Sequence, residues 1–157
     1  MATKTNAVRL VEQAGIPCRE AFYEFDEKDL NGNHAAAAIG MPPEQVFKTL
    51  VARGEKTGIN VFCIPVCCEL NLKKAAKAAG DKNMELVAVK ELLGLTGYIR
   101  GGCSPVGMKK RYPTFFDETC ELYEEIAVSA GERGHQMVLP PLELVHFLGA
   151  KLVDITD

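Results

Sequence analysis

The segment "QVFKTLVARGEKTGINVFCIPVC", residues 45–67, decides the fold because it reads as a β-hairpin. Both arms are rich in β-branched and aromatic residues, and the central "GEKTG" supplies turn-forming glycines. Side chains in a strand alternate between two faces, so Lys48 shares a face with Val46 and Leu50. Both faces of the first arm carry apolar residues, which indicates that at least one of them contacts the core.

Lys48 is the anomaly of this hairpin. A lysine on an apolar strand face either extends its ammonium to water at an edge or holds it in a pocket. The spacing of the residues leaves both interpretations open. Arg53, at the end of the same arm, reads as a solvated cation.

Helical and extended patterns alternate on both sides of the hairpin. Helices are expected over residues 5–14, 33–40, 71–80, 90–95 and 140–150, and a turn or short helix over 118–125. Strands are expected over residues 18–26, 84–89, 113–117, 126–131, 135–140 and 151–156. Asn33 and Asn71 are plausible N-caps, with Gly40 and Gly80 ending the same helices. The order is not a regular βαβ repeat, so we expect a single α+β domain over 1–157, with a mixed, curled sheet and outer helices.

The composition excludes several classes of protein. The 157 residues hold 18 Lys and Arg against 21 Asp and Glu, so any nucleic acid would bind a local basic patch. No apolar run approaches about 20 residues and the start lacks an apolar secretory core, which predicts a cytoplasmic protein without a membrane partner. The six cysteines include no C-x-x-C pair and lie far from the histidines, so neither disulfides nor a metal site is expected.

The second unusual segment is "RGGCSPVGMKKR", residues 100–111. Glycines on both sides of a proline can present backbone N–H groups to an anion or to a polarised carbonyl, although a simple tight turn has the same composition. The segment matches no nucleotide-binding fingerprint. The cations that follow are either solvated or bind phosphates, and the same alternatives hold for the lysines of residues 71–80.

Cys103 and Ser104 are the obvious nucleophiles of this loop, but no base can be assigned to them. His34, His135 and His146 are each interpreted as structural or solvated. Residue types and spacing alone therefore predict an α+β domain with an anion or carbonyl site.

Four motifs carry a family resemblance: "VFKTL" (46–50), "LNLKKAAKAAG" (70–80), "TGYIRGGCSPVGMKKR" (96–111) and "VSAGERG" (128–134). In this order and spacing they resemble the YbaK/EbsC family of free-standing aminoacyl-tRNA deacylases, related to the editing domain of bacterial prolyl-tRNA synthetases. The resemblance runs from about residue 5 to the end. It implies one α+β domain with a mixed, partly barrel-like sheet, no cofactor, and hydrolysis of the ester that joins a wrong amino acid to tRNA, most often cysteine on tRNA for proline.

The resemblance also implies roles for individual residues. The catalytic residues are Lys48 and the backbone at Gly101 and Gly102. The substrate-binding residues are Tyr23, Thr49, Pro105, Ser129 and Gln136. The tRNA-binding residues are Lys73, Lys74, Lys109, Lys110 and Arg111. In this interpretation Lys48 occupies a pocket, and Cys103 is not a nucleophile.

Two departures from the family pattern leave the amino-acid specificity open. Relatives often have an aromatic-glycine-acidic stretch where this chain has "NGNH" (31–34), and some have an acidic residue in place of Gln136. The implied chemistry is attack by the substrate's own thiol or by water. The alternatives are a deacylase for alanine or serine esters, and a non-catalytic module that binds tRNA or a synthetase. The implied partners are aminoacyl-tRNA and a prolyl-tRNA synthetase, with no DNA.

Overall fold

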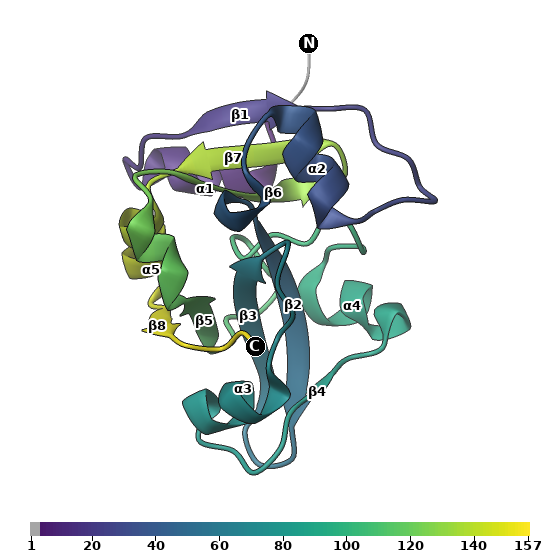
Figure 1. Ribbon diagram of the computed structural model, residues 1–157, viewed down its shortest axis with the longest axis vertical. Helices are drawn as coiled ribbons and strands as arrows, with labels where there is room; N and C mark the ends of the chain where they lie inside the picture. The colour runs from purple at the N-terminus through teal and green to yellow at the C-terminus, as the bar shows by residue number, and fades with distance from the viewer. Residues whose placement is uncertain (1–3) are drawn as a thin grey trace.

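The computed structural model describes residues 4–157 as an α+β fold (Figure 1). The helices are α1 Asn6–Gln13, α2 Gly32–Ile39, α3 Leu72–Ala79, α4 Val89–Thr96 and α5 Pro141–Leu148, with short 3₁₀ turns η1 Pro43–Gln45 and η2 Glu118–Leu122. The strands are β1 Arg19–Phe22, β2 Phe47–Gly54, β3 Gly58–Pro65, β4 Glu85–Leu86, β5 Thr114–Asp117, β6 Ile126–Glu132, β7 His135–Leu139 and β8 Lys151–Val153. The predicted elements are thus present, although β1, β4 and β8 are shorter than expected.

The strands form two sheets. One has five strands in the order β4-β2-β3-β5-β8 and is mixed, because β2 and β3 are antiparallel while β3, β5 and β8 are parallel. The other is antiparallel, in the order β1-β7-β6, and lies across the upper end of the first sheet with α1 and α2 (Figure 1).

The mixed α+β prediction is confirmed, but the expectation of a partly barrel-like sheet is not. An isolated bridge between Val46 and Ala127 joins the two sheets, and they are not closed into a barrel. Beyond that bridge, within residues 4–157, the outer edge of β2 is next covered at Val51, which accepts from Val87 N–H, and at Ala52, which pairs with Leu86 of β4. The interval between the bridge and these contacts leaves part of the β2 edge open.

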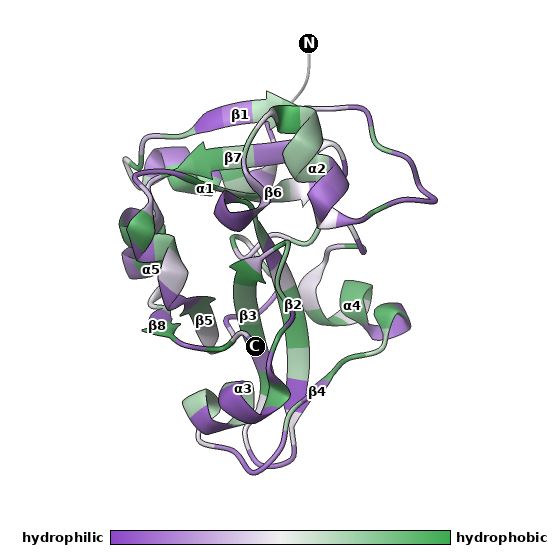
Figure 2. Cartoon of the chain, in the orientation of Figure 1, coloured by the Kyte–Doolittle hydropathy of each residue, from purple (hydrophilic) through white to green (hydrophobic). Residues whose placement is uncertain are grey.

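The hairpin of residues 45–67 forms as predicted, with Phe47 opposite Pro65 and Gly54 opposite Gly58. Each face of β2 contributes buried residues to the core. Phe47 and Val51 belong to the larger core cluster, whereas Ala52 packs in a second cluster that includes residues of α3. Figure 2 shows the hydrophobic colour along much of β3 and β7 and the hydrophilic colour over the hairpin turn and the β1–α2 loop.

The polar end of the hairpin is closed by Asp81. Its carboxylate accepts from the N–H groups of Lys56 and Thr57 and from the Thr57 hydroxyl, at 2.7–3.3 Å. These hydrogen bonds, led by that from the Thr57 N–H, hold the pKa of Asp81 well below its usual range. A Cβ at Gly54 would lie 2.1 Å from an Asp81 oxygen, so a larger residue there would displace the Asp81 carboxylate from the turn.

The helix caps are partly as expected. Asn71 caps α3 by accepting from Lys74 N–H, but α2 is capped by Asn31 and not by Asn33. The cause is a long-range contact, because a Cβ on Gly32 would lie 2.4 Å from Val66. Only glycine lets the first turn of α2 lie against the end of β3. Within residues 4–157 no helix has the length and hydropathy needed to cross a bilayer.

Candidate active site

A pocket of about 700 Å³, the main pocket, lies along the open edge of β2. Its walls come from the end of β1, the start of α2, β2, the segment after β3, the β4–α4 region, the glycine loop, and β6 and β7. Six residues expected at the site line it together: Tyr23, Lys48, Thr49, Gly101, Ser129 and Gln136. The volume is in the range typical of small-molecule sites.

The main chain of Thr49 faces the main pocket. Val66 N–H donates to Val46 O at 2.8 Å, so the alternation of an antiparallel pair turns the main-chain groups of Thr49 away from β3. The next outward residue, Val51, accepts from Val87 N–H at 3.0 Å. Within residues 4–157 the N–H and C=O of Thr49 have no partner. The strand edge therefore offers one donor and one acceptor to a ligand.

Lys48 is a half-buried cation in the wall of this pocket. No carboxylate within residues 4–157 forms an ion pair with it, and its ammonium makes no hydrogen bond there. The pocket interpretation therefore fits better than extension to bulk water at an edge. An unpaired ammonium beside a cavity is suited to an ester carbonyl or a phosphate.

The glycine loop begins with a tight turn. Gly102 N–H donates to Ile99 O at 3.0 Å, and Gly101 has φ +86°, the combination found in a type II turn. The N–H of Gly102 is thus already used, and Gly102 is buried outside the main pocket, so this geometry does not support its expected role as a donor. Gly101 lines the pocket, and its N–H has no partner within residues 4–157.

The nucleophiles suggested by the loop sequence are not activated. Burial raises the pKa of the Cys103 thiol to about 12, so it stays protonated near neutral pH. Ser104 is fully buried, and its hydroxyl accepts from Val106 N–H at 3.2 Å. Pro105, expected to bind substrate, instead lines a second cavity of about 300 Å³ behind the loop, together with Lys110 and Arg111.

The wall opposite β2 contains a buried acceptor without a donor. Gln136 is only 6% exposed, and its Oε1 has no hydrogen-bond partner within residues 4–157. It pairs across the β6–β7 hairpin with Ser129, whose hydroxyl accepts from Gly131 N–H at 3.1 Å. An unpaired buried acceptor is costly in free energy, so this position suits a ligand donor such as an ammonium.

The cations expected to bind tRNA do not form one patch. Lys73 is exposed on α3, whereas the Lys74 ammonium is 3.0 Å from Asp154 and donates to Thr156 O. Lys109 is exposed, and its stem lies beside Gly97.

Sequence reasoning missed several wall residues. Arg100 lines the main pocket at the turn, and the only sequence signal was its place at the start of the glycine loop. Cys67 and Cys68, with sulfurs 3.9 Å apart, also line it, and burial raises the pKa of Cys68 to about 11.

Taken together, the fold and pocket define an α+β domain that can hold an acyl ester between a lysine, outward main-chain groups and a buried acceptor. The sequence model of the family described as the aminoacyl-tRNA editing domain matches residues 32–147 of this chain. The chain belongs to this family, which is one of deacylases, and the resemblance carried by the four motifs is confirmed.

Individual relatives agree with this assignment. The chain is 45% identical over 153 residues to EbsC of Enterococcus faecalis, a proposed Cys-tRNA(Pro)/Cys-tRNA(Cys) deacylase, covering 98% of this chain and 93% of that protein. A crystal structure of a proposed trans-editing enzyme for prolyl-tRNA synthetase superimposes with a TM-score of 0.82 at 27% identity, over 99% of each chain. The hypothetical protein APE2540, at 23% identity and a TM-score of 0.86 over 96% of this chain and 98% of its own, shares the fold.

Proposed function

We propose that residues 1–157 form one editing domain that acts in the cytoplasm and removes cysteine from tRNA for proline. The observation that carries this proposal is that Lys48 and Gly101 line the same pocket, while the Lys48 ammonium and the Gly101 N–H have no partner within residues 4–157. Both groups can stabilise negative charge on the oxygen of an ester carbonyl as it becomes tetrahedral. The need for such an enzyme is physical, because small differences in side-chain size discriminate by only about 10–200-fold.

The proposed reaction uses the thiol of the substrate. A cysteine thiol has a reference pKa of about 8.5, so a small fraction of the substrate's thiol groups is thiolate near neutral pH. Its sulfur attacks the carbonyl carbon of its own ester, the carbon–oxygen bond to the ribose breaks, and the proton lost by sulfur goes to the ribose oxygen. The protein supplies position and charge stabilisation, in keeping with the protonated state of Cys103. Attack by water, which releases cysteine directly, is compatible with the same residues.

The remaining unpaired groups are suited to orienting the aminoacyl end. Gln136 Oε1 can accept from the α-ammonium of the amino acid, and Tyr23 and Ser129 lie in the same wall. The outward N–H and C=O of Thr49 can pair with main-chain-like groups of the substrate or with the terminal adenosine. The exposed cations Lys73, Lys109, Lys110 and Arg111 are proposed to contact tRNA phosphates, and a bound prolyl-tRNA synthetase to add recognition of the tRNA body.

The decisive experiment incubates the protein with cysteinyl-, alanyl- and seryl-tRNA for proline and follows loss of the amino acid. Rapid loss of cysteine alone supports thiol-assisted editing, whereas loss of alanine or serine favours water attack and a different specificity. Binding without deacylation of any ester would identify a non-catalytic module and contradict the proposal. A parallel assay with EDTA tests the expectation that no metal cofactor is needed, and one with prolyl-tRNA synthetase tests the partner.

A further inference from the structure

Arg133 links two motifs that are separate in the sequence. It lies at the hairpin tip, residues 132–135, between β6 and β7, and its Nε donates to Arg100 O at 2.9 Å. The side chain is 23% exposed, and its charged neighbour Glu27 is 4.0 Å away and itself 79% exposed. The strong directional contact of Arg133 is therefore with the main chain of the glycine loop.

The Arg100 carbonyl belongs to the central peptide of the turn, whose other half is the N–H of Gly101. In a trans peptide the C=O and N–H point in opposite directions. Because Arg133 holds the C=O, the Gly101 N–H faces away from Arg133. Gly101 lines the main pocket, which Arg133 does not reach, and both residues also line a small neighbouring cavity.

We propose that Arg133 is a positioning residue for catalysis. It fixes the orientation of the Arg100–Gly101 peptide so that the N–H of Gly101 meets the oxygen that gains charge during ester cleavage. This inference rests on the proposed function, because it concerns the same carbonyl. A donor aligned before the reaction begins stabilises the transition state without reorganising at that moment.

The hairpin tip that carries Arg133 is itself held firmly. A Cβ at Gly102 would lie 3.0 Å from the carbonyl carbon of Glu132, so the two main chains are in close contact. Tyr23 N–H donates to Gly134 O at 3.0 Å, which ties the tip to the end of β1.

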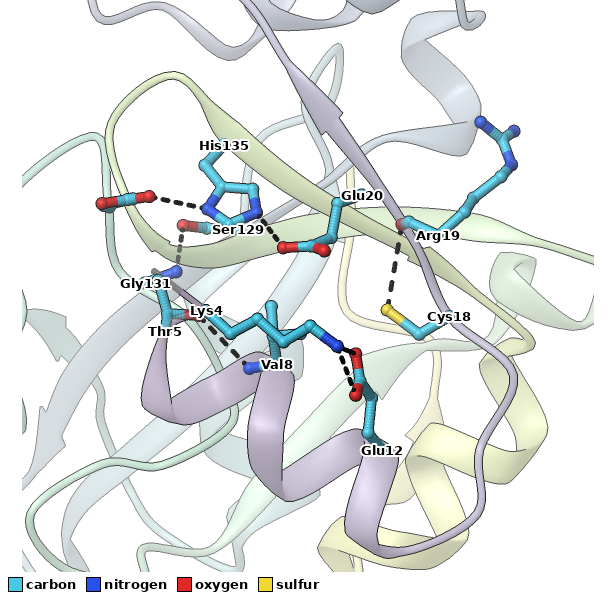
Figure 3. A network of polar contacts seen from close by, with 11 residues as sticks. Lys4, Thr5, Val8, Glu12, Cys18, Arg19, Glu20, Ser129, Gly131 and His135 are labelled. Atoms are coloured by element: carbon cyan, nitrogen blue, oxygen red, sulfur yellow. Dashed lines mark hydrogen bonds and ion pairs between the residues drawn. The ribbon is translucent and has the colours of Figure 1, made fainter. Parts of the chain in front are cut away.

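His135 adds polar contacts that join β7 to both β1 and β6. Its ring lies between Glu20, at 2.9 Å, and a second carboxylate, that of Glu132, at 2.7 Å (Figure 3). It also stacks on Phe22, with ring centroids 4.2 Å apart. A rigid tip lets one arginine set the direction of one peptide.

The test compares Arg133→Met, Arg133→Lys and the control Glu27→Gln in single-turnover deacylation of cysteinyl-tRNA for proline. We expect Arg133→Met to lower the deacylation rate at saturating substrate by about 10–100-fold. This loss is smaller than the roughly 10²–10³-fold loss expected when the hydrogen-bond donor itself is removed. The dissociation constant for tRNA should change less than about twofold, which separates positioning from phosphate binding. Lysine should not restore the rate, because its ammonium lacks the planar Nε–H of arginine. The rate of Glu27→Gln should stay near that of the wild type. In a further variant, Arg133→Ala, added methylguanidinium should restore part of the lost rate.

A readout independent of activity is the NMR spectrum, in which Arg133→Met should shift the Arg100 carbonyl ¹³C and Gly101 amide signals. An Arg133→Met rate near wild type, or a loss confined to tRNA affinity, would overturn the inference. If the wild-type protein does not deacylate any ester, the proposed function fails, and so does the catalytic role of Arg133. Unchanged Arg100 and Gly101 signals would separately overturn the alignment, whatever the activity.

Discussion

The two ends of strand β2 are built on opposite principles. At the Gly54 end, the carboxylate of Asp81 accepts from several groups of the hairpin turn, and Asn60 donates to Thr57 and to Gly58 O. At the other end, Lys48 has no ion-pair partner and the main chain of Thr49 has no hydrogen-bond partner within residues 4–157. Paired polar groups stabilise the fold, whereas unpaired ones in a cavity are available to a ligand. The difference separates polar groups that stabilise the fold from polar groups that can bind a ligand, within eight positions of one strand.

The largest expected effect comes from the unpaired end. Lys48→Ala should lower single-turnover deacylation by about 10²–10³, because it removes the cation that we propose faces the ester. The fold should persist, since the substitution breaks no ion pair within residues 4–157. Lys48→Arg should fail as well, because a planar fork does not replace a compact ammonium in a confined site. Circular dichroism with thermal melting is the control for folding, and a near wild-type rate for Lys48→Ala would place the chemistry elsewhere.

A substitution at the paired end should lower stability and leave the deacylation rate unchanged. Asp81→Asn should lower the melting temperature while the folded protein keeps its deacylation rate. The hydrogen bonds depress the folded-state pKa of Asp81, so its stabilising contribution is complete above the unfolded pKa of about 3.9 and is lost as the pH falls through the folded value. The stability gap between wild type and variant should therefore be full at pH 7 and narrow in strong acid. Urea unfolding at several pH values measures it, and a gap that widens on acidification would contradict the assignment.

Much of the paired end could be predicted from the sequence, because its signals are local. The hairpin of 45–67 and the Asn71 cap depend on residues a few positions apart. The pocket end depends on contacts between distant segments, such as Gly32 against Val66. No local sequence pattern indicates such contacts, so neither the Asn31 cap nor the absence of a closed barrel could be predicted from the sequence. Lys48 was found because a charge on an apolar strand face is itself a local signal.

Gln136 tests, with a smaller expected effect, whether the unpaired polar groups of the pocket bind the substrate. Gln136→Met keeps the shape of the side chain but removes its orphan acceptor, so the melting temperature should stay equal or rise. Deacylation at low substrate concentration should fall about tenfold, the worth of one hydrogen bond to the substrate. Thermal melting and the ratio of kcat to KM measure the two effects. A less stable variant with unchanged kinetics would identify Gln136 as a structural residue.

Cys103 should contribute less still, although it lines the pocket. Burial keeps its thiol protonated, with a pKa of about 12, so Cys103→Ala should retain most deacylation of cysteinyl-tRNA. A decrease of about a hundredfold in a folded variant would mean that the protein thiol is the nucleophile. Single-turnover rates, with melting as the folding control, decide between these outcomes.

The smallest effect is expected from the surface lysines, where the same contrast between engaged and free charges applies. Lys109 and Lys110 are exposed, and no carboxylate within residues 4–157 pairs with them, whereas the Lys74 ammonium is held by Asp154 and Thr156 O. Replacing both free lysines by alanine should reduce the slope of log affinity against log salt by about 0.7–0.9 for each phosphate that the protein no longer neutralises. Lys74→Met is the matched control, and it should leave the slope unchanged but loosen the packing of α3 against the C-terminal segment. Filter binding of tRNA at several salt concentrations measures the slope. If Lys74→Met lowers the slope and the double variant does not, the tRNA lies against α3 and not against the glycine loop. In that case the Lys74 ammonium leaves the Asp154 carboxylate and binds a tRNA phosphate instead.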